Sequence, residues 1–195
     1  MTDPDLLLEE RQRTDHLFMP EDHMEEVYAS QNPIVRFFHL GRLEAIAREV
    51  PRSSNLKVLD AGCGEGHLLR KLHEEKPARQ YYGVDITEAA LEKARQRCPS
   101  AHLRKANLAK TGFEAEFFDL IICTEVLEHI FEYETAAKEL KRILKPEGQL
   151  IVTFPNEFIW TTGRFLLGRR PIKVPDHVPF GMKARDVSKV SSRPP

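Results

Sequence analysis

Hydrophobic and polar residues follow two different rhythms along this chain. Between Asn32 and Pro51, apolar residues recur at the three- and four-residue spacing of a helix, and Pro33 suits its first turn. From Lys57 onward, short apolar runs alternate with stretches of helical spacing. This alternation predicts βαβ units, and therefore an α/β fold with a doubly wound, mostly parallel sheet and helices on both faces.

The short apolar runs predict five strands, and we expect them in the sheet order 3-2-1-4-5. Three helices are expected between the strands. The first follows Gly66, the second begins after Thr87 as its N-cap, and the third runs over 134–144 and ends at a KPEG turn. The strands are expected at 57–61, 81–85, 102–106, 118–123 and 149–154.

Less regular segments flank the predicted core. Residues 1–31 are polar and acidic and are expected to form an N-terminal lid. Residues 32–156 form the core, and 157–195 form an irregular C-terminal segment that is a candidate substrate lid.

Composition narrows the classes of partner and compartment. The formal net charge of −1 provides no overall positive field, so nucleic acid is not the expected partner. Three cysteines suit free thiols in a reducing compartment rather than a disulfide framework. We find no apolar run of about 18 residues and no basic, apolar leader, so neither a membrane span nor a signal peptide is expected. A cytoplasmic protein is the expectation.

A glycine-rich loop follows the first predicted strand. The sequence VLDAGCGEG places Gly62, Gly64 and Gly66 between a strand and a helix, where the backbone can turn tightly and approach a ligand. Asp85 ends the next strand, where a carboxylate can bind both hydroxyls of an adenosine ribose. The spacing is G-x-G-x-G rather than the dinucleotide G-x-G-x-x-G, which would need glycine at His67. Asp60 suits a ligand with an ammonium and a sulfonium, so S-adenosylmethionine is favoured over NAD.

The ordered motifs from about 32 to 156 resemble those of the class I S-adenosylmethionine-dependent methyltransferases. They are VLDAGCGEGHLL, YYGVDIT, KANL, FDLIICTEVLEHI and LKPEGQLIVTFPN. The resemblance implies S-adenosylmethionine as cofactor, S-adenosylhomocysteine as product, and methyl transfer to a small-molecule acceptor that could be hydrophobic, with O-methylation slightly favoured. The resemblance implies that Asp85 is the ribose-binding acid and that Asn107 faces the adenine amine. The implied cofactor-binding residues are Asp60, Gly62, Cys63, Gly64, Asp85, Ile86, Asn107, Leu108 and Thr124.

The sequence departs from that family after the fifth strand. Family members close the sheet with a hairpin of two further strands, whereas the residues after Pro155 show no two clear strands. We therefore expect either a sheet of five strands or an improvised edge.

The EVLEH element after the fourth strand carries the candidate catalytic residues. A helical turn there would place Glu125, Glu128 and His129 on one face at the carboxyl edge of the sheet. The favoured interpretation is metal-free, with His129 as a base and the two carboxylates orienting it. The alternative is a divalent metal held by these three and His177, since E-x-x-E-H resembles metal-dependent small-RNA 2′-O-methyltransferases and some ubiquinone-pathway O-methyltransferases.

Two further alternatives concern the whole chain. It could be a cofactor-binding subunit without activity of its own, because the missing strands would leave the acceptor site open. A homodimer is a second open alternative. An NAD dehydrogenase is disfavoured by the glycine spacing.

Overall fold

The computed structural model describes residues 33–51, 53–77, 79–130 and 132–154. The chain divides into two units, Met1–Glu49 and Val50–Pro195. The predicted lid at 1–31, the irregular segment at 157–195 and the question of a closing hairpin lie outside the described residues.

Helix α3, Pro33–Glu49, is the described element of the first unit. It begins at the proline that suits a first turn and ends before Pro51, as the sequence predicts. Leu43, Ile46 and Ala47 are buried at the expected three- and four-residue spacing.

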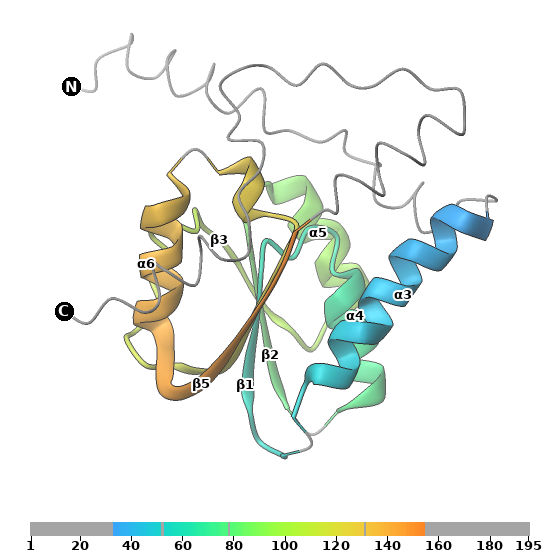
Figure 1. The fold of residues 1–195 in the computed structure, drawn as a ribbon, viewed down its shortest axis with the longest axis horizontal. Helices are drawn as coiled ribbons and strands as arrows, with labels where there is room; N and C mark the ends of the chain where they lie inside the picture. Colours follow the sequence, from blue (N-terminus) through green and yellow to red (C-terminus); the bar gives the residue numbers. More distant parts are fainter. Residues whose placement is uncertain (1–32, 52, 78, 131, 155–195) are drawn as a thin grey trace, which may run out of the picture. The chain divides into compact units, whose positions relative to one another are not determined.

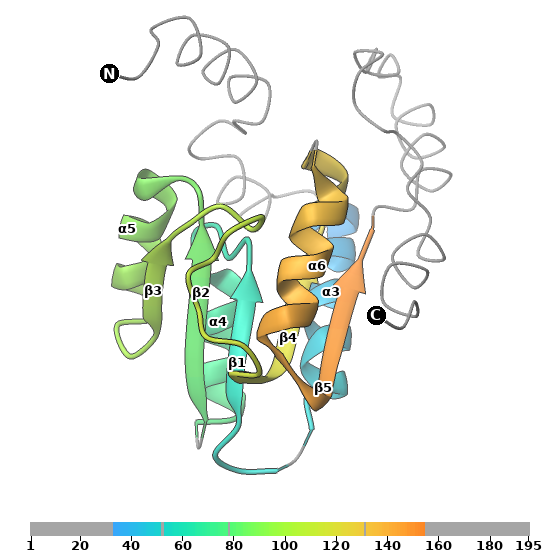
Figure 2. The same ribbon diagram turned by 90° about the vertical axis from the view of Figure 1, so that its left-hand side faces the viewer.

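The second unit is built on a five-stranded sheet in the order β3-β2-β1-β4-β5, in which every pair of neighbours is parallel. The predicted strand order and direction are confirmed. Figure 1 labels the elements, and Figure 2 shows the strands side by side in this order. The strands are β1 (Lys57–Ala61), β2 (Gln80–Asp85), β3 (His102–Lys105), β4 (Phe118–Thr124) and β5 (Leu144–Thr153).

Helices cover both faces of this sheet, as predicted. They are α4 (His67–Glu75), α5 (Glu88–Arg97), α6 (Tyr133–Ile143) and the short 3-10 helix η1 (Leu127–His129). Figure 2 shows α6 on one face of the sheet and α4 on the other. α4 buries Leu68, Leu69 and Leu72, whereas the α6 side forms a core around Phe118, Ile121 and their neighbours. Each fully buried side chain of this size stabilises the fold by about 1.5–3 kcal/mol.

The start of β5 differs from the sequence prediction. A KPEG turn was expected to separate helix from strand, but β5 begins at Leu144, directly after α6. Phe118 and Leu120 of β4 pair with Leu144 and Gln149, so the KPEG residues form an irregularity within the strand rather than a turn before it. The prediction of a strand beginning at 149 was wrong because pairing with β4 recruits the residue next to the helix.

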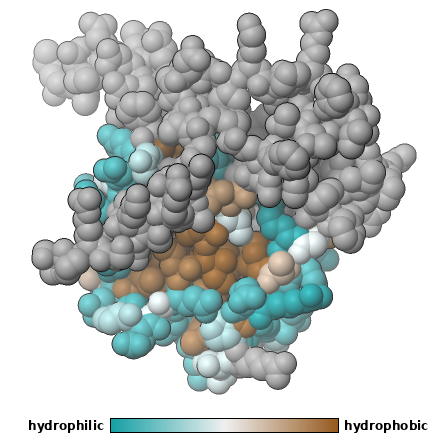
Figure 3. Space-filling view, in the orientation of Figure 1, coloured by the Kyte–Doolittle hydropathy of each residue, from teal (hydrophilic) through white to brown (hydrophobic). Residues whose placement is uncertain are grey.

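The residues along β5 from Leu150 to Phe154 are half-buried. Figure 3 shows apolar side chains gathered on the face over this strand, with hydrophilic residues along the lower rim. In the described part of the chain, no helix has the length and apolar character needed to cross a bilayer. The three cysteines are free and buried, as expected.

Candidate functional site

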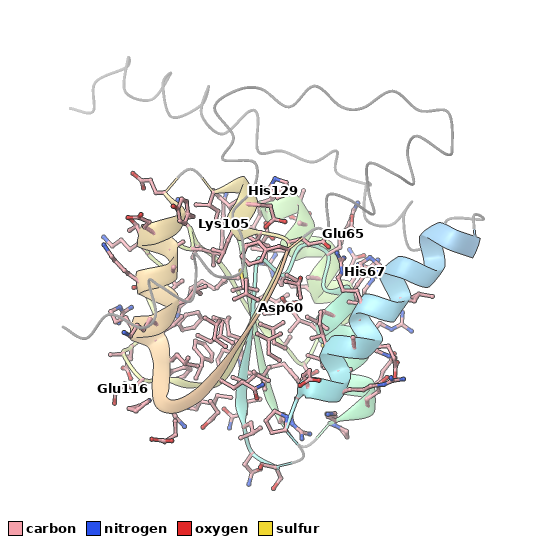
Figure 4. All side chains as sticks on the ribbon, in the orientation of Figure 1. Asp60, Glu65, His67, Lys105, Glu116 and His129 are labelled. Carbon is pink, nitrogen blue, oxygen red and sulfur yellow. The ribbon has the colours of Figure 1, made fainter. Side chains whose placement is uncertain are left out.

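The candidate site lies at the carboxyl ends of the parallel strands, where open α/β sheets bind ligands. The glycine loop, residues 62–66, leads from β1 into α4. Figure 4 shows Glu65, His67 and His129 toward this end of the sheet and Glu116 at the opposite end.

The three loop glycines all adopt left-handed backbone conformations, with φ of 82° at Gly62, 48° at Gly64 and 79° at Gly66. L-residues with a Cβ rarely adopt this conformation, so the sequence needs glycine here. A Cβ on Gly62 would lie 2.4 Å from Cγ2 of Val126. A Cβ on Gly64 would meet nothing within 4 Å, so the backbone there borders open space that a ligand can approach.

Asp85 binds this loop directly. Its Oδ2 accepts a hydrogen bond of 2.8 Å from the backbone N–H of Gly64. Its Oδ1 accepts one of 2.9 Å from the N–H of Thr87, at the start of α5. The sequence therefore placed a carboxylate correctly at the edge of the glycine loop, and these contacts fix its orientation.

Asp60 is a buried acid behind the loop, only 2 % exposed. Burial, and then the negative charge of Asp85, raise its pKa to about 7. Its Oδ1 has no hydrogen-bond partner among the described residues. An unpaired buried carboxylate oxygen is costly, and a positively charged ligand would satisfy it.

Other predicted cofactor residues differ in how they lie. Ile86 is 43 % exposed beside Asp85, and Thr124 is half-buried at the end of β4. Cys63 is buried, and this burial together with Asp60 and Asp85 raises the pKa of its thiol, so the thiol stays protonated.

Two predicted residues follow β3. The exposed Asn107 accepts a hydrogen bond of 2.8 Å from the N–H of Ala109 through its Oδ1, which forms a local turn. Leu108 is 6 % exposed and belongs to the hydrophobic core, so its side chain packs inward. Only its backbone is therefore a candidate for ligand contact.

The strand-four turn, Glu125–His129, does not have the predicted geometry. Glu125 has a φ of 52°, in the left-handed region, and donates its N–H to the carbonyl of Thr153 on β5 at 3.1 Å. The helical turn is a 3-10 helix limited to Leu127–His129. The expectation that Glu125 shares one helical face with Glu128 and His129 was wrong, because pairing with β5 turns its backbone out of the helix.

Comparison with known proteins agrees with the glycine loop and the strand order. Residues 59–152 match the family model of a methyltransferase domain. The chain is 33% identical over 117 residues to a probable S-adenosylmethionine-dependent methyltransferase of Mycobacterium tuberculosis, a match covering 60% of this chain and 42% of that protein. It is 32% identical over 124 residues to a ubiquinone biosynthesis O-methyltransferase of Actinobacillus pleuropneumoniae, covering 59% and 52%. The solved structure of a S-adenosylmethionine-dependent methyltransferase from Thermotoga maritima matches with a TM-score of 0.56 at 28% identity, over 70% of this chain and 59% of that one.

Residues 59–152 form a class I S-adenosylmethionine-dependent methyltransferase domain. The family resemblance read from the glycine loop and the later motifs is thereby confirmed. The chain spans about half the length of the curated relatives it matches.

His129, the predicted base, ends the 3-10 helix η1 in the strand-four turn. Partial removal of the His129 ring from water lowers its pKa, an effect that the nearby Glu125 carboxylate opposes. The imidazole is therefore neutral at pH 7 and able to accept a proton. Glu128 is half-buried. The pKa of the Cys123 thiol is raised mainly by burial, then by the charge of Asp60, and also by the charge of Glu128. The Glu128 carboxylate therefore lies near Cys123, close to the end of β4.

The metal alternative finds no ligand set in the part of the chain that the structure describes. No group of three or more His, Cys, Asp or Glu side chains there could hold a metal ion. His177, the proposed fourth ligand, lies outside the described residues.

Sequence reasoning missed one charged cluster in the domain. Glu65, within the glycine loop, is 5 % exposed and lies 3.1 Å from Nζ of Lys93 and 3.3 Å from Nε2 of His67. Nη1 of Arg97 lies 3.7 Å from its Oε2. The available signal was the i,i+4 spacing of Lys93 and Arg97, which puts two cations on one face of α5.

Proposed function

We propose that this chain is a S-adenosylmethionine-dependent methyltransferase that transfers a methyl group to a small-molecule acceptor. The observation that carries the proposal is the Asp85 carboxylate, which lies at the glycine loop through its contact with Gly64 N–H. The backbone of Gly64 borders open space at this point. A ribose could therefore reach the carboxylate without a Cβ in its way.

The described residues fit this cofactor. Asp85 would bind the ribose hydroxyls, and the exposed apolar surface of Ile86 beside it suits a flat adenine ring. The unpaired Oδ1 of Asp60 suits the positive charge of the methionine part. When bound, the cofactor supplies an electrophilic methyl group on a sulfonium.

On the acceptor side, we assign His129 as the base. Its neutral imidazole would take the proton of an acceptor hydroxyl, while Glu125 orients the ring and stabilises its charged form. The domain otherwise contributes alignment of the two reactants and exclusion of water. This arrangement favours O-methylation, and the Actinobacillus relative is named an O-methyltransferase. The Thermotoga protein is described as a possible histamine N-methyltransferase, so relatives do not agree on the acceptor atom. The metal-free mechanism, a homodimer and a cytoplasmic location stay predictions.

Titration calorimetry with S-adenosylmethionine and S-adenosylhomocysteine tests the proposal, followed by a screen of acceptors for S-adenosylhomocysteine release. Binding together with turnover is the expected result. Binding without turnover on any acceptor would favour the alternative, a cofactor-binding subunit. Absence of binding to either compound would overturn the proposed function.

A further inference from the structure

Glu65 is a buried negative charge in the middle of the glycine loop. Its side chain is 4 % exposed and points toward α5, where Lys93 and Arg97 lie. Figure 4 shows Glu65 and His67 near each other at this end of the domain, and their side chains are 3.3 Å apart. The loop therefore sits against a helix that presents positive charge to it.

Arg97 contacts both the side chain and the main chain of Glu65. Its Nη1 donates to the Glu65 carbonyl oxygen and also lies 3.7 Å from Oε2. A guanidinium that binds two groups at once fixes geometry as well as charge. The peptide that follows Glu65 is thereby held in one orientation.

The next residue packs against the same helix. A Cβ on Gly66 would lie 3.0 Å from Cβ of Ala94, so the backbone of Gly66 lies directly on α5. Lys93, Ala94 and Arg97 thus form a continuous face of α5 against the loop. α5 therefore contacts residues 65 and 66, and Asp85 at the end of β2 binds Gly64 N–H.

We propose that Glu65 is a positioning residue for the cofactor: with Arg97 and Lys93 it holds the glycine loop in the conformation that leaves Gly64 open to the ligand. The inference rests on the proposed function and deepens it. The Glu65 carboxylate contacts Lys93 and Arg97 of α5, so it acts on the ligand through the loop. Misplacing a binding loop by about 1 Å can cost up to about 10²-fold.

A contribution to stability alone explains this cluster less well. Burying an ion pair removes both charges from water, and such pairs often add little net stability compared with apolar residues. An ion pair does fix the relative position of the two segments it joins. The glycine loop is where a fixed position matters, because its three left-handed residues allow many alternatives.

The experiment measures the Kd of S-adenosylhomocysteine by calorimetry for the parent, Glu65→Gln, Arg97→Gln and the double variant. We expect about tenfold weaker binding in each single variant. The double variant should lose much less than the two losses combined, because the two groups act as one unit. With a responsive acceptor, the KM for the cofactor should rise while kcat at saturating cofactor changes less than about twofold.

Two controls separate positioning from stability. Glu74→Gln breaks an exposed ion pair with Arg70 on α4 and should leave the Kd unchanged. Glu139→Gln breaks the contacts of Glu139 with Thr111 and Arg142 and should lower the melting temperature without changing the Kd. If Glu65→Gln does not fold, Arg97→Gln and Lys93→Gln decide the same question.

The outcomes are distinct from those for the proposed function. If the parent binds neither cofactor form, the proposed function fails. If the parent binds and a folded Glu65→Gln binds equally tightly, the positioning role is overturned and the proposed function stands. A loss of affinity in Glu139→Gln as large as in Glu65→Gln would also overturn it, since the loss would then follow from reduced stability.

Discussion

The two ends of the candidate site are held in different ways. On the cofactor side, the glycine loop is fixed by Asp85, by Glu65 and by direct packing on α5. On the proposed acceptor side, the strand-four turn consists of a three-residue 3-10 helix and the left-handed Glu125, whose N–H donates a backbone hydrogen bond of 3.1 Å to β5. Side chains from β2 and α5 thus hold the glycine loop, whereas the strand-four turn is held by backbone hydrogen bonds and by the buried Leu127 in the core.

This difference separates binding from chemistry. Changes at the glycine loop should alter cofactor affinity, and changes at the strand-four turn should alter turnover. The two meet at one place, since Gly62 lies against Val126 of the turn.

The largest effect is expected on the acceptor side. His129→Ala should lower turnover by about 10²–10⁴ because it removes the base, while cofactor Kd should stay unchanged. Parent turnover should also fall as pH drops below the lowered pKa of His129, where the imidazole becomes protonated. Steady-state kinetics across pH 5–9 check both expectations.

Two outcomes would contradict this role of His129. Loss of activity with EDTA and recovery with Mg²⁺ would instead support the metal mechanism. Full activity in His129→Ala would leave His129 with a structural role alone.

A steric clash between the glycine loop and the strand-four turn should lower the free energy of unfolding. Gly62→Ala would put a Cβ 2.4 Å from Val126 at a φ of 82°, so we expect about 2–4 kcal/mol of destabilisation from strain and overpacking. Urea unfolding measures this loss. Gly41→Ala, inside α3 where a Cβ meets nothing within 4 Å, should instead stabilise the protein by about 0.5–1 kcal/mol. Adding Val126→Ala to Gly62→Ala should recover part of the loss, and an unchanged midpoint in Gly62→Ala would contradict the contact.

On the cofactor side alone, Asp85→Ala should weaken S-adenosylmethionine binding by about 1.5–3 kcal/mol, the scale of lost hydrogen bonds to a charged group. Calorimetry gives the Kd. Asp119→Asn is the matched control for the loss of a hydrogen-bonded aspartate outside the site. Asp119 accepts hydrogen bonds from Lys145 Nζ and from the N–H of Lys57 at the start of β1. Equal affinity in the parent and in Asp85→Ala would remove Asp85 from the site.

The smallest effect is the pH dependence that Asp60 gives to the cofactor side. Its pKa of about 7 lies above the usual 3.8, so in the ligand-free protein it holds a proton below pH 7. A cationic cofactor favours the ionised form, so affinity should rise by at most about tenfold between pH 6 and 8 and level off above pH 7.

The same shift has the opposite sign for folding. Because the folded pKa is raised, the contribution of Asp60 to the free energy of unfolding is full below about pH 4 and is lost as pH rises through 7. Asp60→Asn should flatten both profiles, as measured by calorimetry and by thermal melts. Profiles that are identical in the parent and in Asp60→Asn would show that another group titrates.

The sheet was predictable because its signal is local. β1, β2, β4 and most of β5 are apolar runs bounded by glycine, proline or polar turns, and β1 matches its predicted bounds. β3 gave a weaker pattern because it pairs only with β2 in the described sheet and leaves His102, Arg104 and Lys105 exposed. The strand order followed from the family resemblance and is confirmed.

What the sequence could not supply depends on contacts between distant residues. Glu125 leaves the helical turn because its N–H meets Thr153, and β5 starts early because Leu144 pairs with Phe118. Neither partner is visible in a local pattern. The pKa of a side chain likewise depends on its surroundings in the fold, so the spacing of residues could not predict the raised pKa of Asp60.

The sequence by itself therefore determined where the glycine loop lies and that its turning residues are glycine, because left-handed backbone and close approach restrict residue type directly. Only the tertiary structure decided what holds that loop. Glu65 meets Arg97 across 32 positions of sequence, and Asp85 meets Gly64 across 21. The first pair forms where α5 packs against the loop and the second where β2 pairs with β1, and such contacts between distant segments, unlike helix or strand periodicity, leave no regular pattern in the chain.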